Sequence, residues 1–101
     1  MKTINPGAYY EAILQLRNPN QEAINCILNA VKRRKDVSIV RVEDVKDGHD
    51  FYISSQRFTK TLGKKLNQSF NGTLKESKKL YGMNRQTSRQ VYRGTIFFKL
   101  D

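Results

Sequence analysis

The chain has 101 residues and a mass of 11.7 kDa, enough for one domain over residues 1–101 with a modest hydrophobic core, but not for two. It carries 19 Lys and Arg against 9 Asp and Glu, a formal net charge of +10 that favours a polyanionic partner, nucleic acid before a membrane surface. The apolar runs are too short to span a membrane, and the N-terminus lacks a signal-peptide core. We therefore expect a cytoplasmic protein without a membrane partner.

No residue pattern indicates catalysis, a cofactor or a metal site. The single Cys26 has no second cysteine for a disulfide or a zinc clamp, and its apolar surroundings in the sequence indicate packing. His49 lies beside Asp47 and Asp50, but three neighbouring turn residues rarely converge on one ion, whereas Asp is ordinary in turns. We expect a binding domain and not an enzyme.

After a turn-prone leader over residues 1–7, the sequence predicts a strand from Ala8 to Arg17 and then a helix. The alternating residues expected on the buried strand face are Tyr10, Ala12, Leu14 and Leu16. The predicted helix has Asn18 at its N-cap, Pro19 at its first position and Gln21 completing a capping box. Its last turn contains Lys32 to Lys35, for which a solvated helix end and a phosphate-contacting patch are equally good interpretations.

The β-branched run from Val37 to Val45 predicts a second strand, and Phe51 to Ile53 a third. Between them Asp47 and Gly48 predict a tight turn, in which the glycine supplies a positive φ.

A second helix is expected from Ser55 to Phe70, with serine oxygens at its start and Asn71-Gly72 in a left-handed cap at its end. Phe58, Leu62, Leu66 and Phe70 recur every four residues and should face the sheet. A separate basic stripe contains Arg57, Lys60 and Lys64, with Lys65 beside it.

The polar run from Thr73 to Tyr81 predicts an exposed edge strand, and Gly82 to Arg89 a loop. The final strand, Gln90 to Leu100, should bury Tyr92, Gly94, Ile96, Phe98 and Leu100. The resulting fold class is α+β in the order β-α-β-β-α-β-β, an open mixed sheet with two helices packed on one face. The other face would carry Tyr9, Ile13, Arg93 and Phe97.

Three segments resemble the nonsense-mediated-decay protein three family of archaea and eukaryotes, whose eukaryotic members are export adapters of the large ribosomal subunit. They are Gly7 to Arg17, Asp47 to Ser55, and Ser77 to Gly82 continuing to Val91 to Thr95. The middle segment, a turn and an aromatic strand followed by two serines, is the most specific. The resemblance covers the family's central domain and implies an archaeal-type protein acting on the large subunit. It leaves open a stand-alone protein or a fragment of a longer parent chain.

Two functions from different classes follow. In the first, the domain contacts ribosomal RNA phosphates through Arg57, Lys60, Lys64, Lys65, Lys78, Lys79, Arg85 and Arg89. In the second, the open sheet face with Tyr9, Ile13, Arg93 and Phe97 docks a ribosomal protein or a flanking domain.

Overall fold

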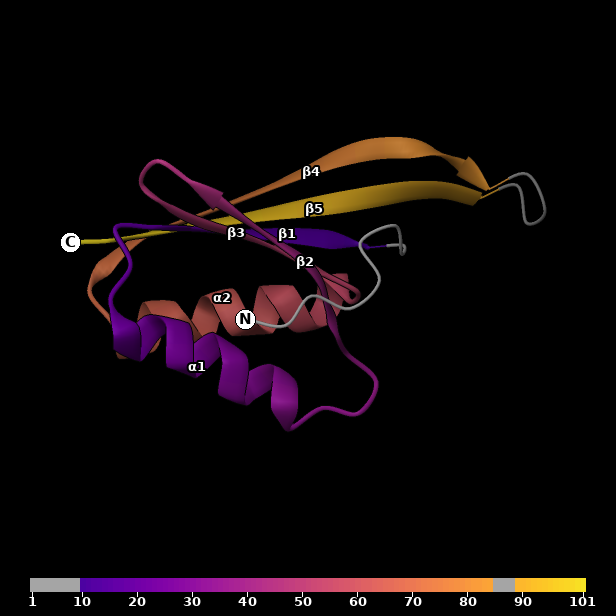
Figure 1. Cartoon of the computed structure of the whole chain (residues 1–101). Coiled ribbons are helices and arrows are strands. Elements are labelled where there is room, and N and C mark those ends of the chain that lie inside the picture. The colour runs from indigo at the N-terminus through magenta and orange to yellow at the C-terminus, as the bar shows by residue number, and fades with distance from the viewer. Residues whose placement is uncertain (1–9, 85–88) are drawn as a thin grey trace.

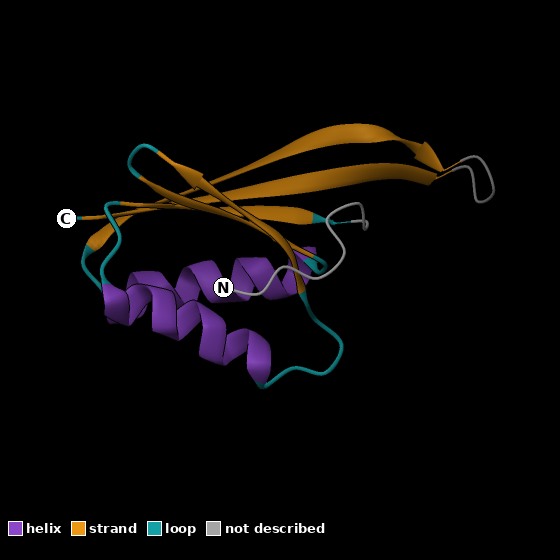
Figure 2. Ribbon diagram, viewed as in Figure 1, coloured by secondary structure: helices purple, strands orange, loops and turns teal. Residues whose placement is uncertain are grey.

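The computed structural model describes residues 10–84 and 89–101, and their side chains except over 79–92. It is a two-layer α+β fold, with a five-stranded sheet on one side and two helices on the other (Figures 1 and 2). The elements in chain order are β1 (Ala12–Arg17), α1 (Gln21–Lys32), β2 (Ile39–Val45), β3 (Gly48–Ile53), α2 (Gln56–Ser69), β4 (Gly72–Asn84) and β5 (Arg89–Leu100). The expected element order and fold class are confirmed.

The sheet has the strand order β2-β3-β1-β5-β4 and is mixed, because β1 pairs with β5 in parallel while the other neighbours are antiparallel. The polar strand β4 lies at an edge, as its composition predicts. The helices cover one sheet face and leave the other uncovered (Figure 2).

The core lies between the sheet and the helices and follows the two sequence periods. Strand residues alternate inward, and each helix buries one apolar stripe. In α2, Phe58, Leu62 and Leu66 are buried and Phe70 is partly buried against them, so the predicted stripe is confirmed. The fully buried strand side chains include Leu14, Leu16, Phe51, Ile53, Ile96 and Phe98.

The start of α1 differs from the prediction. Asn20 is the N-cap, because its side chain accepts a hydrogen bond from the Ala23 N–H at 2.8 Å. Gln21 donates to Asn25 and so makes no capping box. Asn18 has a φ of 52° and takes the chain out of β1, which Asn tolerates better than most residues. The helix ends at Lys32, so the next three cations lie beyond it.

Ser55 caps α2 as expected, accepting from the Phe58 N–H at 3.2 Å. The positive φ predicted for Gly48 and Gly72 is wrong. Among the described residues, Gly48 and Gly72 have no positive φ. A Cβ at Gly48 would instead collide with the carbonyl of Leu16, and one at Gly72 with the carbonyl of Lys99. Close approach of a neighbouring strand, and not turn geometry, requires glycine at both positions.

Within the predicted loop over Gly82 to Arg89, Gly82 to Asn84 and Arg89 belong to strands, while residues 85–88 lie outside the described residues. Pairing continues through Gly82 with Val91, Met83 with Gln90 and Asn84 with Arg89, after a register shift between Leu80 and Gly82. The register shift leaves one extra residue in β4, and an extra residue breaks the side-chain alternation from which a strand is predicted. The alternating pattern in the sequence therefore ends before the strand does. The β4–β5 hairpin extends beyond the helix layer (Figure 1).

Candidate nucleic-acid interface

The outer surface of α2 carries the predicted basic stripe. Because the apolar stripe faces the sheet, Arg57, Lys64 and Lys65 are exposed on the opposite side. Lys60 is half-buried, and its ammonium lies 3.4 Å from the Glu76 carboxylate on β4. Three of the four predicted α2 cations therefore have no acidic partner within ion-pair distance in the described part of the chain.

The segment after α1 lies against the start of α2. The guanidinium of Arg34 lies over the ring of Phe58, 5.5 Å from its centroid, and also pairs with Asp36 at 3.1 Å. This pairing raises the pKa of Arg34 and lowers that of Asp36. The contact places cations from two separate stretches of sequence on one surface.

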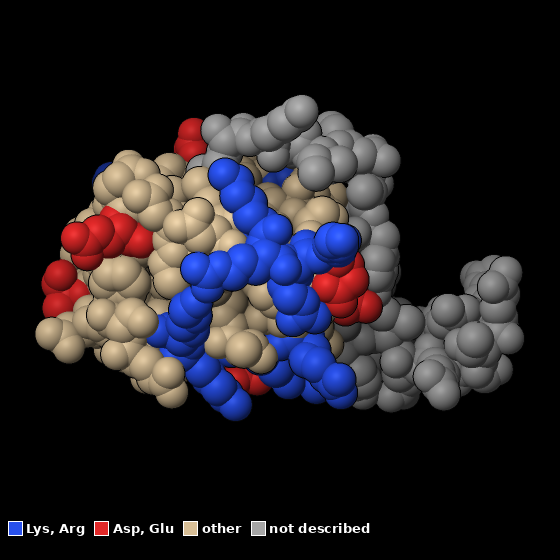
Figure 3. Space-filling view, turned by 90° about the horizontal axis from the view of Figure 1, so that it is seen from below, with Lys and Arg blue, Asp and Glu red and all other residues tan. Residues whose placement is uncertain are grey.

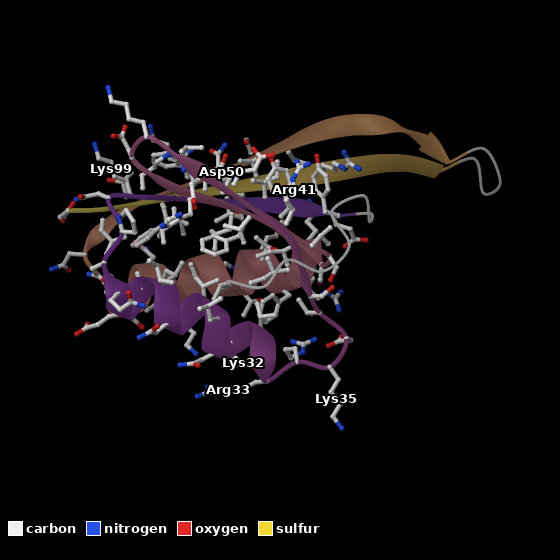
Figure 4. All side chains as sticks on the ribbon, in the orientation of Figure 1. Lys32, Arg33, Lys35, Arg41, Asp50 and Lys99 are labelled. Carbon is white, nitrogen blue, oxygen red and sulfur yellow. The ribbon has the colours of Figure 1, made fainter. Side chains whose placement is uncertain are left out.

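We call this surface the basic helix face. Figure 3 shows Lys and Arg side chains gathered over the helix layer, and Figure 4 shows Lys32, Arg33 and Lys35 on the side of the helices that faces away from the sheet. All its members are exposed except the half-buried Lys60. They are Lys32, Arg33, Arg34 and Lys35 after or at the end of α1, and Arg57, Lys60, Lys64 and Lys65 on α2.

Lys78 lies beside the basic helix face. It pairs with Gly94 across the β4–β5 ladder, and a Cβ on Gly94 would meet the side chain of Gln56 in α2, so this part of the ladder borders the helix. The backbones of Lys79 and Arg89 belong to β4 and β5, but their side chains lie outside the described residues, as does all of Arg85.

The opposite, uncovered face of the sheet is partly apolar. Ile13 and Phe97 lie on it and are half-buried, whereas Tyr9 falls outside the described residues. Arg93 is engaged, because its guanidinium lies 3.9 Å from the Tyr10 ring centroid and its Nε donates to the Tyr10 carbonyl at 3.1 Å.

Tyr10 was expected on the helix side together with Ala12, and this is wrong. It precedes β1, so strand alternation does not fix its direction, and its ring packs edge-on against Tyr52 at 4.9 Å. Arg41 completes this group, lying 4.1 Å from the Tyr52 ring centroid. The sequence gives no signal for the cluster, because it depends on which residues pair across strands.

This aromatic and arginine cluster shifts two ionisation equilibria. Tyr52 is only 9% exposed, and burial raises the pKa of its phenol, although the hydrogen bond with Arg41 acts in the opposite direction. The same hydrogen bond raises the pKa of Arg41, whose guanidinium also lies 3.0 Å from Glu43. The cluster is a packed structural element of the sheet face.

The acidic and histidine residues of the β2–β3 turn do not converge. His49 Nδ1 lies 2.8 Å from Asp44, while Asp50 pairs with Arg17 at 2.7 Å. Within residues 10–84 and 89–101, no group of three or more metal-ligating side chains forms a possible ion site. In the same residues, no helix is long and apolar enough to cross a membrane.

Together the fold and the site define a basic two-layer α+β domain in which many of the described Lys and Arg side chains gather on the helix layer. The sequence matches the family model described as the second domain of NMD3 over residues 9–100, and the chain belongs to the NMD3 family. Eukaryotic members of this family are non-catalytic export adapters of the large ribosomal subunit. A search of curated proteins gave no match.

Proposed function

We propose that this domain binds structured ribosomal RNA of the large subunit through the basic helix face. The observation that carries the proposal is the contact of Arg34 with Phe58, which joins the cations after α1 to those of α2. Cations from two separate segments gather on one surface, which is more positive charge than the dipole of a single helix end requires. Such a surface suits an extended polyanion.

The mechanism is phosphate recognition with release of counterions. Lysine and arginine on an exposed surface neutralise phosphates without reading base identity, and double-stranded RNA is recognised mainly by shape and backbone. Arg34 and Lys60 already pair with Asp36 and Glu76, so they contribute less new charge neutralisation. The strongest contributions should come from Arg33, Lys35, Arg57, Lys64 and Lys65, with Lys78 extending the surface along β4.

The proposal is tested by measuring binding of the domain to purified large ribosomal subunits and to ribosomal RNA alone across a salt series. We expect binding to bare RNA, with affinity falling steeply as salt rises. The variant with Arg57→Glu and Lys64→Glu should lose most of this binding, since both side chains are exposed and fold stability should change little.

A matched control carries the same charge change on the sheet face, Lys46→Glu with Lys99→Glu, both also exposed. On an RNA duplex of about 16 base pairs, the span of a double-stranded RNA-binding domain, only the helix-face variant should bind weakly. Equal loss in both variants would show a general charge effect, and retention by the helix-face variant would remove the basis of the proposal.

A further inference from the structure

The uncovered sheet face contains a cleft of about 940 Å³ between the end of β1, the β2–β3 turn and the last residues of β5. It lies on the opposite side of the sheet from the basic helix face. Phe97 contributes the aromatic surface, Val45 an apolar wall, and Lys46 and Lys99 two exposed ammonium groups. The sequence pattern of β5 predicted Phe97 on this face but not the cleft around it.

The walls of the cleft are held by hydrogen bonds. Asn18, in its left-handed conformation, donates its backbone N–H to the Asp47 carbonyl at 2.8 Å and its side-chain amide to the Leu100 carbonyl at 3.0 Å. Asn18 thus connects the β2–β3 turn and the end of β5 to the end of β1 through hydrogen bonds. A residue keeps such a sparsely populated backbone conformation only where the surrounding contacts hold it there. The geometry of this part of the cleft is therefore fixed by the fold.

The charge of the cleft favours an anion. Its lining includes Arg17, Lys46 and Lys99 against the single carboxylate of Asp47. Arg17 is compensated by Asp50, but Lys46 and Lys99 have no acidic side chain within ion-pair distance among the residues the structure describes. Lys75, which pairs with Phe97 across the β4–β5 ladder and is exposed, adds a third cation on this side.

The half-buried ring of Phe97 therefore lies among ammonium groups, with Lys99 two residues on along the same face of β5. A stacking aromatic beside cations is the arrangement by which proteins hold single-stranded nucleic acid, with the base on the ring and the phosphate near the cations. Figure 4 shows Lys99 on the side of the sheet opposite Lys32, Arg33 and Lys35.

We propose that this cleft binds an unpaired nucleotide of RNA, with its base stacked on Phe97 and its phosphates contacted by Lys46 and Lys99. The inference rests on the proposed function in taking ribosomal RNA as the partner, and it adds a second contact of a different kind. The domain would then lie between an RNA duplex on its helix layer and a single-stranded nucleotide on its sheet.

The test is a titration of the isotope-labelled chain, followed by amide chemical shifts, with two probes. The first is an oligoadenylate of about eight nucleotides, within the range that single-strand sites occupy, and the second is the duplex of about 16 base pairs. We expect the oligoadenylate to shift the amides of Val45, Lys46, Phe97 and Lys99, and the duplex to shift those of α2.

Substitutions at Phe97 separate stacking from general apolar contact. Phe97→Leu keeps an apolar side chain without a π face and should weaken oligoadenylate binding about fivefold to 150-fold, the usual range for losing one stacked base. Phe97→Tyr keeps the ring and should bind almost as the parent does. Neither change should alter duplex binding, whereas Lys64→Glu should weaken the duplex and spare the oligoadenylate.

The outcomes distinguish this inference from the function on which it rests. Duplex binding on α2 without oligoadenylate shifts in the cleft would overturn the nucleotide site and leave the proposed function standing. Failure of both probes would overturn both. If Phe97→Glu abolishes binding to large subunits while the oligoadenylate leaves the cleft unchanged, the sheet face is a protein interface and the nucleotide site is wrong.

Discussion

The guanidinium of Arg34 lies over the ring of Phe58, with 5.5 Å between its central carbon and the ring centroid. Phe58 belongs to the core and is 8% exposed, so the arginine covers the small part of the ring that reaches the surface. The contact connects the segment after α1 to the first turn of α2. The basic helix face therefore depends on helix packing as well as on the two clusters of cations themselves.

Removing single charges from the basic helix face should reduce the salt dependence of RNA binding stepwise. With Arg33→Gln or Lys64→Gln, the slope of log affinity against log salt for the RNA duplex should fall in magnitude by about one, the loss of one phosphate contact. Lys46→Gln, on the sheet face, is the control and should leave the slope unchanged. Binding measured at several salt concentrations decides this, and an unchanged slope in both helix-face variants would contradict it.

The capping arrangement of α1 predicts different effects for two neighbouring polar residues. Asn20→Ala should lower the free energy of unfolding by about 1 kcal/mol, because the Ala23 N–H loses its acceptor. Gln21→Ala should change it by less than about 0.5 kcal/mol, because the exposed Gln21 makes no capping box. Urea unfolding of the two variants measures this. Equal losses of unfolding free energy would show that Gln21 takes part in capping, as the predicted capping box requires.

Gly48→Ala should destabilise the fold by about 1–3 kcal/mol, as overpacking does, because the added methyl group would collide with the Leu16 carbonyl. Backbone carbonyls of paired strands cannot move aside without disturbing the β1–β3 ladder. Asp47→Ala, at the exposed neighbouring turn position, serves as the control and should cost much less. Thermal or urea unfolding would reveal the difference, and a neutral Gly48→Ala would show that the strand has room.

Tyr52 should make the fold sensitive to alkaline pH. Burial raises the pKa of its phenol in the folded state. The unfolded phenol ionises near about pH 10, so the stability from keeping it neutral is fully present below that pH. It is lost as pH rises through the higher folded pKa. Unfolding free energies measured on both sides of pH 10 should therefore fall more steeply in the parent chain than in Tyr52→Phe; parallel curves would contradict this.

Periodic segments of the sequence were sufficient to predict most of the fold. The four-residue spacing of Phe58, Leu62 and Leu66 and the alternation of Ile96, Phe98 and Leu100 each determine one buried face, and the structure confirms both. Local patterns failed where a distant segment decides the geometry. The Leu16 carbonyl, not the turn, explains Gly48, and the contact of Asn18 with Asp47 and Leu100 displaces the helix cap to Asn20.

The candidate site, like the fold, could be predicted from the sequence only in its local parts. The spacing of Arg57, Lys60 and Lys64 places them on one face of a helix from the sequence alone, and Ser55 fixes where that helix starts. That Arg34 would lie beside Phe58 depends on the angle at which two helices pack, which no local pattern contains. The cleft at Phe97 depends likewise on strand order, which the sequence did not determine.

The parallel pairing of β1 with β5 also determines when the sheet can be completed during synthesis. Ala12 pairs with Gly94 and Arg17 with Lys99, so the first described strand waits for nearly the last residues of the chain. Until β5 has left the ribosome, one edge of β1 has no neighbouring strand, although β3 can already cover the other. Such distant pairing slows folding, because the closure of a long loop precedes the contacts that stabilise it. Pairing of β1 with β5 is therefore a late step in the folding of this domain.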